Sequence, residues 1–354
     1  MGDSMLKVGV IGIGAIGKVH LDAYAAFPDR ARIVAVCDPL KDRADEAAGK
    51  YGAKSFTDYR DLLSCDVDAV SVCVPNALHR EIAVASLKAG KHVLLEKPMA
   101  LNAKEASEIV ATAKASGRNL QMGMPFRQLP EAQCVRSLVA AGELGDIYHM
   151  RVVMIRRRGV PGLGGWFTTK AMSGGGPLID IGVHFFDVAM YLSGLWNPTS
   201  VSAMTYAKFG VRMKDYVYTD MWAGPPNYSG VCDVEDYATG LVRFGKKATM
   251  SFEVSWAANI RSESFCDICG DKAGVRTGMD GSLVILTEYQ RKVADICPQL
   301  PKGRNRFHAQ AENFIAACVG QAKPAATGEE GLICMKLIDA VYASAESGRE
   351  VPIS

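Results

Sequence analysis

Two acidic side chains flank a histidine in an otherwise apolar stretch that is predicted to form a helix over residues 178–193. Asp180, His184 and Asp187 stand at i, i+4 and i+7, which places them on one face of a helix. A carboxylate one turn from an imidazole fixes its tautomer and favours its protonated form, as a general acid or base near neutral pH requires. From the spacing alone, a histidine that only hydrogen-bonds within a packed core is an equally good interpretation.

A lysine lies where a buried strand is expected to end. Residues 92–95 form a short apolar run, and Glu96, Lys97 and Pro98 follow it. At the carboxyl end of a strand, Lys97 could hold a hydroxyl or carbonyl oxygen and help move its proton. The alternative is a surface charge paired with Glu96, but the position favours the chemical role.

The sequence near the N-terminus contains the glycine spacing of a dinucleotide-binding turn. After a short apolar strand, Gly12 permits a tight turn, Gly14 allows close approach of a pyrophosphate, and Gly17 allows the helix to pack on the strand. The first N–H groups of the following helix can bind that pyrophosphate. The candidate cofactor-binding residues of this turn are Gly12, Gly14, Ala15, Ile16 and Gly17.

A second apolar run, residues 32–37, ends in Asp38. An acidic residue about 20 positions after the glycine turn is expected to contact the ribose of the adenosine. The order strand, glycine turn, helix, strand and acid therefore predicts a dinucleotide site, with NAD favoured over NADP. Lys41 and Arg43 follow Asp38 closely enough to hold a 2′-phosphate, so NADP is the alternative.

Strand and helix patterns alternate through the first third of the chain, which predicts an α/β fold with an N-terminal doubly wound parallel sheet of the Rossmann type. Ligands of such sheets bind beyond the carboxyl ends of the strands. The glycine turn and the breaks at 75–79 and 96–98 should therefore face one cofactor. These breaks add to the candidate cofactor-binding residues Pro75, Asn76, His79, Glu96 and Lys97.

After residue 124 the pattern changes to runs of strands with few helices, which predicts an α+β domain with an open, mostly antiparallel sheet. The predicted domains are residues 1–124, which bind the dinucleotide, and residues 125–354. A glycine-rich loop at 159–176 carries Trp166 and could cover a substrate. A segment at 216–228, rich in proline, glycine and aromatic residues, is predicted to be a surface insertion or a pocket lid.

Composition and charge exclude several classes of protein. The 354 residues are 49% hydrophobic and 22% charged, which is enough for two cores. A net charge of +2 gives no basic surface for nucleic acid. No apolar run approaches the roughly 18 residues of a membrane span, and the N-terminus lacks a secretory pattern. We therefore expect a cytoplasmic protein without nucleic-acid or membrane partners.

The ten cysteines are scattered, mostly within apolar runs, as is typical of free thiols in a reducing cytoplasm. Cys266 and Cys269 have the spacing of half a zinc site. Because no second pair is present, no metal site is predicted.

Together these motifs resemble the Gfo/Idh/MocA oxidoreductases, the family of glucose-fructose oxidoreductase and inositol dehydrogenase. The resemblance rests on the glycine pattern, on PNALH at 75–79, on GKHVLLEKP at 90–98 and on DIGVH at 180–184. It spans both predicted domains. It implies NAD(P) at the domain boundary, a second domain that binds substrate, and homodimers or homotetramers built through the open sheet.

The resemblance also implies roles for the candidate catalytic residues. Lys97 would be a hydroxyl-binding proton-relay lysine, Asp180 an orienting carboxylate and His184 the general acid or base. The implied substrate is a carbohydrate or cyclitol whose secondary alcohol exchanges a hydride with the nicotinamide. The candidate substrate-binding residues are Arg127, Trp166, Lys170, Asp180 and His184. For the first three, a packed aromatic and solvated cations are equally good interpretations.

Two other functions are compatible with the same residues. An NAD-dependent glycoside hydrolase, which oxidises a sugar hydroxyl transiently, eliminates the aglycone and returns the hydride, would use the same lysine and histidine. The segments at 159–176 and 216–228 could hold its larger substrate. A non-catalytic NAD-binding regulator would be expected to lack Lys97 or His184, and both are present.

Overall fold

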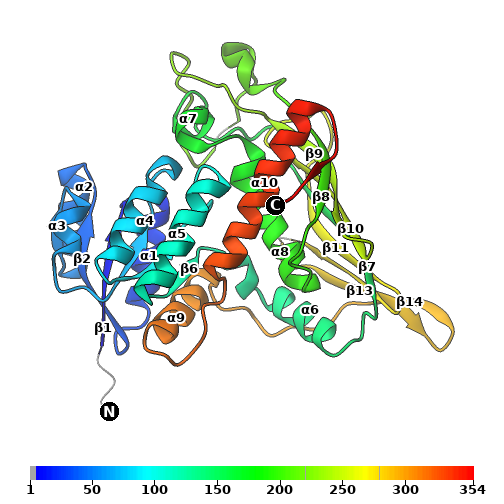
Figure 1. Ribbon diagram of the computed structural model, residues 1–354, viewed down its shortest axis with the longest axis horizontal. Coiled ribbons are helices and arrows are strands. Elements are labelled where there is room, and N and C mark those ends of the chain that lie inside the picture. Colours follow the sequence, from blue (N-terminus) through cyan, green and yellow to red (C-terminus); the bar gives the residue numbers. More distant parts are fainter. Residues whose placement is uncertain (1–4, 220, 279) are drawn as a thin grey trace. The chain divides into compact units, whose positions relative to one another are not determined.

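The computed structural model describes residues 5–219, 221–278 and 280–354 (Figure 1). The chain forms two compact units. The first contains the residues up to 128 together with 304–332, and the second contains 129–303 together with 333–354. The assignment of cofactor binding to residues 1–124 and of substrate binding to residues 125–354 stays a prediction.

The first unit is built on a six-stranded sheet in the order β3-β2-β1-β4-β5-β6, and every strand pair in it is parallel. This confirms the predicted Rossmann sheet. Its strands are β1 (Leu6–Ile11), β2 (Ala31–Cys37), β3 (Lys54–Phe56), β4 (Ala69–Val72), β5 (His92–Leu95) and β6 (Leu120–Met122). Its helices are α1 (Ala15–Ala25), α2 (Lys41–Tyr51), α3 (Tyr59–Leu63), α4 (His79–Lys88), α5 (Ala103–Ser116) and α9 (Arg306–Cys318).

The composition of the strands explains this arrangement. All four residues of β4 are buried, as expected of a central strand covered by helices on both faces. Helix α5 starts at the Asn102 cap, whose side chain accepts the Glu105 N–H, and it ends at the left-handed Gly117. Helix α9, from the C-terminal part of the sequence, adds Phe314 to the core beside Leu21 of α1.

The second unit is built on a nine-stranded sheet in the order β14-β13-β12-β11-β7-β10-β9-β8-β15. Among the strand pairs of the described residues, only β7 and β10 run parallel, which confirms the mostly antiparallel sheet. Its strands are β7 (Ile147–Ile155), β8 (Ser200–Tyr206), β9 (Tyr237–Phe244), β10 (Ala248–Ser255), β11 (Glu263–Gly270), β12 (Gly274–Gly278), β13 (Leu283–Tyr289), β14 (Lys292–Ile296) and β15 (Val351–Pro352).

Helices cover one face of this sheet. Phe186 of α8 (Val183–Ser193) packs edge-on against Phe252 of β10, with ring centroids 5.0 Å apart. The remaining long helices are α6 (Pro130–Ala140) and α10 (Gly328–Ser347), and α7 (Lys170–Ser173) is one short turn. Large apolar side chains such as Tyr148, Met204 and Val293 are exposed on the strands.

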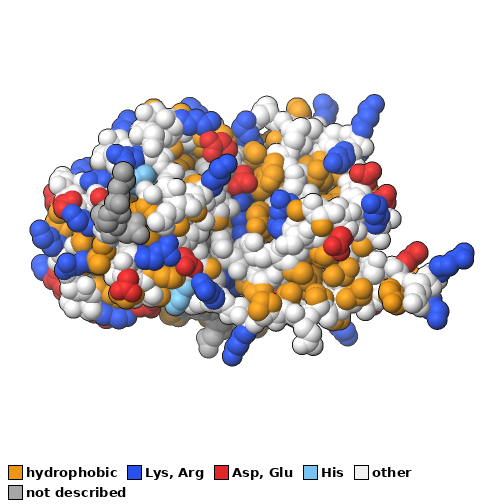
Figure 2. Space-filling model, turned by 90° about the horizontal axis from the view of Figure 1, so that it is seen from below, with side chains coloured by type: hydrophobic (Ala, Val, Ile, Leu, Met, Phe, Trp, Pro, Cys, Tyr) orange, Lys and Arg blue, Asp and Glu red, His pale blue; other side chains and the backbone are white. Residues whose placement is uncertain are grey.

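The described residues form no helix with the length and apolar character that crossing a membrane requires. On the face drawn in Figure 2, basic and acidic side chains are interspersed, in keeping with the small net charge.

Candidate active site

The parallel sheet of the first unit brings the predicted cofactor-binding segments to one edge. The strand order places the carboxyl ends of β2, β1, β4 and β5 side by side, and each is followed by one of those segments. Gly12 has a φ of +89°, and a methyl group on it would lie 2.6 Å from the Cys73 carbonyl oxygen. A methyl group on Gly17 would overlap the carbonyl of Gly12. The turn therefore requires glycine at both positions.

The start of α1 fits a pyrophosphate. A methyl group on Gly14 would meet nothing within 4 Å, so the backbone is open to a ligand there. Gly14 is the N-cap of α1, and no side chain caps the helix or places an acid in its first turn. The N–H groups of Ala15 and Ile16 thus begin a helix whose positive end is available to an anion.

Asp38 lies at the end of β2 with only 3% of its surface exposed. Its Oδ2 accepts the Ile13 N–H at 2.9 Å, and its Oδ1 accepts the Leu40 N–H at 3.0 Å. Arg43 donates to Asp38 at 3.3 Å, and Lys41 pairs with Asp45. Both cations that could have served a 2′-phosphate are engaged with acids, which favours NAD over NADP.

We predict that Asp38→Ser weakens NAD binding by about 10- to 100-fold, because hydrogen bonds to a charged acceptor are lost. The ratio of NADP to NAD affinity should rise, since the carboxylate that repels a 2′-phosphate is gone. Calorimetric titration with both nucleotides measures the ratio, and Asp42→Ser, an exposed acid in α2, is the control. An unchanged ratio in Asp38→Ser would contradict the assignment.

His79 is buried between two loops. Its Nδ1 lies 2.6 Å from the carbonyl oxygen of Pro98, and its Nε2 lies 2.9 Å from that of Val74. Burial lowers the pKa of His79, and the contacts with the two carbonyl oxygens oppose that shift. His79 therefore ties the segment after β4, which contains Pro75 and Asn76, to the segment after β5. A direct contact of these three residues with the cofactor stays a prediction.

Glu96 is buried and held by its own unit. Its Oε1 lies 2.9 Å from Nε2 of His20, and its Oε2 accepts the Lys97 N–H at 3.3 Å. The other nitrogen of His20 lies 3.1 Å from the Ser71 hydroxyl, which also contacts Tyr24 at 2.7 Å. The sequence interpretation missed His20; the signal was a polar residue on the buried side of α1.

The charges of this pair are coupled. Burial alone would lower the pKa of His20, but contact with Cys73 and Glu96 raises it above its ordinary value of 6.5. Burial alone would raise the pKa of Glu96, but the hydrogen bond from His20 lowers it. The buried pair is therefore an imidazolium and a carboxylate, and it fixes the backbone from which the half-buried Lys97 projects.

In the second unit, the helix that carries Asp180 and His184 is not a regular α-helix from its start. Residues Leu178–Gly182 form a π-helical turn, and α8 follows from Val183. A π-turn holds an additional residue, which changes the angle between Asp180 and His184 relative to the predicted α-helical stripe. Both side chains are half-buried, whereas Asp187 is fully buried. Single π-turns occur frequently at functional sites.

A buried acid holds the start of this turn. The Glu235 carboxylate accepts the N–H groups of Gly176 and Leu178, at 2.9 and 3.1 Å, and the Tyr342 hydroxyl at 3.0 Å. Burial raises the pKa of Glu235, while these donors oppose the shift. Glu235 therefore positions the backbone that carries Asp180. The sequence interpretation missed Glu235, because it lies 57 and 59 residues from the two N–H groups that it binds, and such a separation gives no local signal.

We predict that Gly176→Ala destabilises the protein by about 1–3 kcal/mol, because its methyl group would overlap the backbone carbonyl of Glu235. Displacement of the turn should also reduce kcat. The matched control is Gly49→Ala on the exposed face of α2, where a methyl group meets nothing within 4 Å and should stabilise by about 1 kcal/mol. Equal effects of the two changes in urea unfolding would contradict the prediction.

Two residues beside Asp180 were not predicted. Nε1 of the buried Trp256 donates to Oδ2 of Asp180 at 3.2 Å. Arg156, which follows β7, interacts electrostatically with the same carboxylate.

The three further candidates for substrate binding occupy different environments. Arg127 is 1% exposed and donates to Glu330 at 2.8 Å and to the Ala325 carbonyl oxygen at 2.8 Å, so it holds together parts of the first unit. Trp166 is half-buried and stacks on Phe167 at 3.8 Å. Lys170 is exposed. A substrate contact from each of them stays a prediction.

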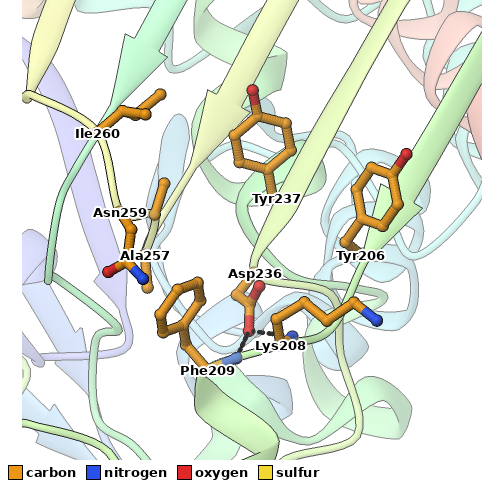
Figure 3. A pocket seen from close by; sticks show the side chains of 9 residues that line it. Tyr206, Lys208, Phe209, Asp236, Tyr237, Ala257, Asn259 and Ile260 are labelled. Atoms are coloured by element: carbon orange, nitrogen blue, oxygen red, sulfur yellow. Dashed lines mark hydrogen bonds between the residues drawn. The ribbon is translucent and has the colours of Figure 1, made fainter.

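A pocket of about 310 Å³ lies where β8 ends, β9 begins and β10 ends (Figure 3). Asp236 at its edge accepts the N–H groups of Lys208 and Phe209 through Oδ2, as drawn, and Tyr206 and Tyr237 stand above it. None of the sequence-predicted site residues lines this pocket.

The described residues bring no three histidine, cysteine or acidic side chains together in a way that could hold a metal ion. Cys266 and Cys269 are free thiols on β11, and burial raises the pKa of both.

Comparison with known proteins identifies the family to which this chain belongs. Residues 6–124 match the oxidoreductase family with an NAD-binding Rossmann fold, and residues 132–276 match the GFO/IDH/MocA C-terminal domain. The chain belongs to the Gfo/Idh/MocA family, and it is an NAD-dependent oxidoreductase.

Particular relatives match over the full length. The chain is 38% identical to D-glucoside 3-dehydrogenase of Escherichia coli (strain K12), covering 100% of this chain and 99% of the relative. It is 26% identical to inositol 2-dehydrogenase of Rhizobium meliloti (strain 1021), covering 99% of both. Among solved structures, levoglucosan dehydrogenase in complex with NADH has the same fold, with a TM-score of 0.87, 23% identity, and coverage of 99% of this chain and 100% of that chain.

Proposed function

We propose that this protein oxidises a secondary hydroxyl group of a sugar or glycoside, with NAD as the hydride acceptor. The observation that carries the proposal is the half-buried Asp180 in a π-turn that leads directly to the half-buried His184, in a chain with an NAD-binding unit. Glu235 binds the backbone at the start of the turn, and Trp256 donates to Asp180. The full-length similarity to a protein named D-glucoside 3-dehydrogenase supports a glucoside as the substrate.

The proposed roles follow from the chemistry of each group. Bound NAD would supply the nicotinamide that takes the hydride, and Asp38 with the N–H groups after Gly14 would hold it. His184 accepts the proton of the hydroxyl group, so that the carbon–hydrogen bond can break as the carbonyl forms. Asp180 orients His184, and Lys97 donates a hydrogen bond to the oxygen on which negative charge develops.

A substrate panel tests the proposal. Purified protein with NAD and a series of methyl glycosides, free sugars and inositols should produce NADH, measured by its absorbance, with at least one neutral sugar. Mass spectrometry of the isolated product should show the loss of two hydrogens. Absence of NADH with the whole panel, in protein that binds NAD, would overturn the proposal.

The hydrolase alternative is not favoured by the relatives, which are named as dehydrogenases. It predicts release of a chromogenic aglycone at catalytic amounts of NAD without net NADH. The same panel, with p-nitrophenyl glycosides added, distinguishes the two reactions.

We also propose that the protein acts in the cytoplasm as a homodimer or homotetramer. The ten free cysteines suit a reducing compartment, and the exposed apolar residues on β7, β8 and β14 suit an interface between copies. Light scattering coupled to gel filtration gives the mass of the particle, and a mass of one chain would contradict the oligomer.

A further inference from the structure

Arg156 lies at the end of a strand beside the candidate catalytic helix. Strands β7 and β10 run parallel with Ile155 opposite Ser255, so the next residues, Arg156 and Trp256, occupy equivalent positions. Side chains two residues apart on a strand share a face. Phe252 packs against α8, which places Trp256 and, by register, Arg156 on the face that α8 covers.

The donors of Arg156 are poorly used. A guanidinium has five N–H donors. Among the described residues, the side chain of Arg156 makes one hydrogen bond, from Nη1 to the Gly159 carbonyl oxygen at 3.4 Å. No carboxylate of the described residues forms an ion pair with it. Arg127, by contrast, is saturated by Glu330 and a carbonyl oxygen at 2.8 Å.

Leaving the N–H donors of Arg156 without acceptors costs free energy, unless another group accepts hydrogen bonds from them. Burial removes water from Arg156 and lowers its pKa, and the charge of Asp180 opposes the shift. A desolvated cation with unfilled donors needs acceptors to offset the lost hydration. Protein groups supply one weak acceptor, and Arg156 is half-buried, so its remaining donors are open to solvent and to a ligand that displaces it.

We propose that Arg156 binds the substrate by donating to the oxygens of two neighbouring hydroxyl groups, next to the hydroxyl group that is oxidised. This inference rests on the proposed function and assigns a specificity residue to it. Guanidinium presents two parallel donors, which match a pair of adjacent oxygens. The nearby Asp180 already balances its charge, so the substrate is a neutral polyol, and an acidic sugar is disfavoured. Arg156 can only donate to hydroxyl oxygens, whereas Asp180 can accept from hydroxyl O–H groups. Together the two side chains can therefore hydrogen-bond to both hydroxyl groups of a diol.

Steady-state kinetics with Arg156→Gln and Arg156→Lys test the inference. We expect KM for the sugar to rise by about 10- to 100-fold in Arg156→Gln, while the dissociation constant of NAD stays unchanged. Arg156→Lys keeps the charge but loses the second parallel donor, so it should recover only part of the affinity. The control is Arg157→Gln, an exposed neighbour on the same segment, which should retain the wild-type KM.

A series of monodeoxy sugars separates binding from a general structural effect. Removing a hydroxyl group that Arg156 contacts should lower kcat/KM about tenfold in the wild type and have no effect in Arg156→Gln. Equal penalties in both proteins for every deoxy sugar would overturn the inference, as would an unchanged KM.

Three outcomes separate this inference from the proposed function. A wild-type preference for uronic acids over neutral sugars would overturn the inference that the substrate is a neutral polyol. Failure of the wild type to oxidise any sugar would overturn the proposed function and this inference together. Wild-type turnover with an unaffected Arg156→Gln variant overturns only the inference. Thermal unfolding of each variant identifies any that fail to fold, and Arg156→Lys then carries the test.

Discussion

Replacing His184 with asparagine is expected to lower kcat by about 10²- to 10⁴-fold, the range that general acid–base catalysis contributes. Asparagine can hydrogen-bond but cannot accept the hydroxyl proton. Lys97→Met should reduce kcat similarly, because the developing charge on oxygen loses its donor. Stopped-flow measurement of NADH formation in a single turnover gives the chemical step directly.

The control for this experiment is a histidine of the same unit that hydrogen-bonds within the sheet and is not a candidate site residue. His149 lies on β7, where its Nδ1 is 2.8 Å from the Thr249 hydroxyl. His149→Asn should keep its kcat within a few-fold of the wild type. The dissociation constant of NAD should be unchanged in all three variants. A His184→Asn enzyme that turns over as fast as His149→Asn, or a Lys97→Met protein that no longer binds NAD, would contradict the assigned roles.

Replacing His20 with leucine is expected to destabilise the first unit by about 3–5 kcal/mol, since breaking a buried ion pair leaves one charge without compensation. The orphaned charge would be Glu96, which is 6% exposed. Urea unfolding followed by circular dichroism measures the loss. Adding Glu96→Gln to His20→Leu removes the charge and should recover part of the stability. If the loss of stability in the double variant equals the sum of the losses in His20→Leu and in Glu96→Gln, the two side chains are not energetically coupled.

The same pair makes stability depend on pH. The raised pKa of His20 gives stability that is complete below its unfolded value of 6.5 and is lost as the pH rises above it. The lowered pKa of Glu96 gives stability that is complete above its unfolded value of 4.5 and is lost as the pH falls. The pair therefore stabilises most between about pH 4.5 and 6.5. Melting temperatures should fall from pH 6 to pH 9 in the wild type, and less in the double variant.

Much of the fold was predictable because its signals are local. The alternation of apolar strands and helices predicted the parallel sheet, and Gly117 ends α5 as expected from the left-handed conformation that glycine adopts at helix ends. Strand β14 gives little sequence signal, because it is an exposed edge strand with no apolar run. The π-turn at Leu178–Gly182 was missed because residue spacing does not distinguish it from an α-helix.

Only those residues of the site that belong to a sequence motif could be predicted. The glycine turn, Asp38, Lys97 and the spacing of Asp180 and His184 are sequence signals. The groups that hold them come from elsewhere in the chain: Glu235 reaches the π-turn, and Trp256 reaches Asp180 across 76 residues. Such contacts depend on tertiary packing, and nothing local in the sequence distinguishes Glu235 from any other buried acid.

The start of the π-turn has consequences for redesign. Side chains on Gly175 or Gly176 would overlap the Tyr342 hydroxyl or the Glu235 backbone, so this segment admits no variation in size. New substrate range must therefore come from positions around it whose side chains can be exchanged without moving the backbone. The strand end at Arg156 and the loop bearing Trp166 are where a mutant library should be concentrated, with the triple-glycine segment left untouched.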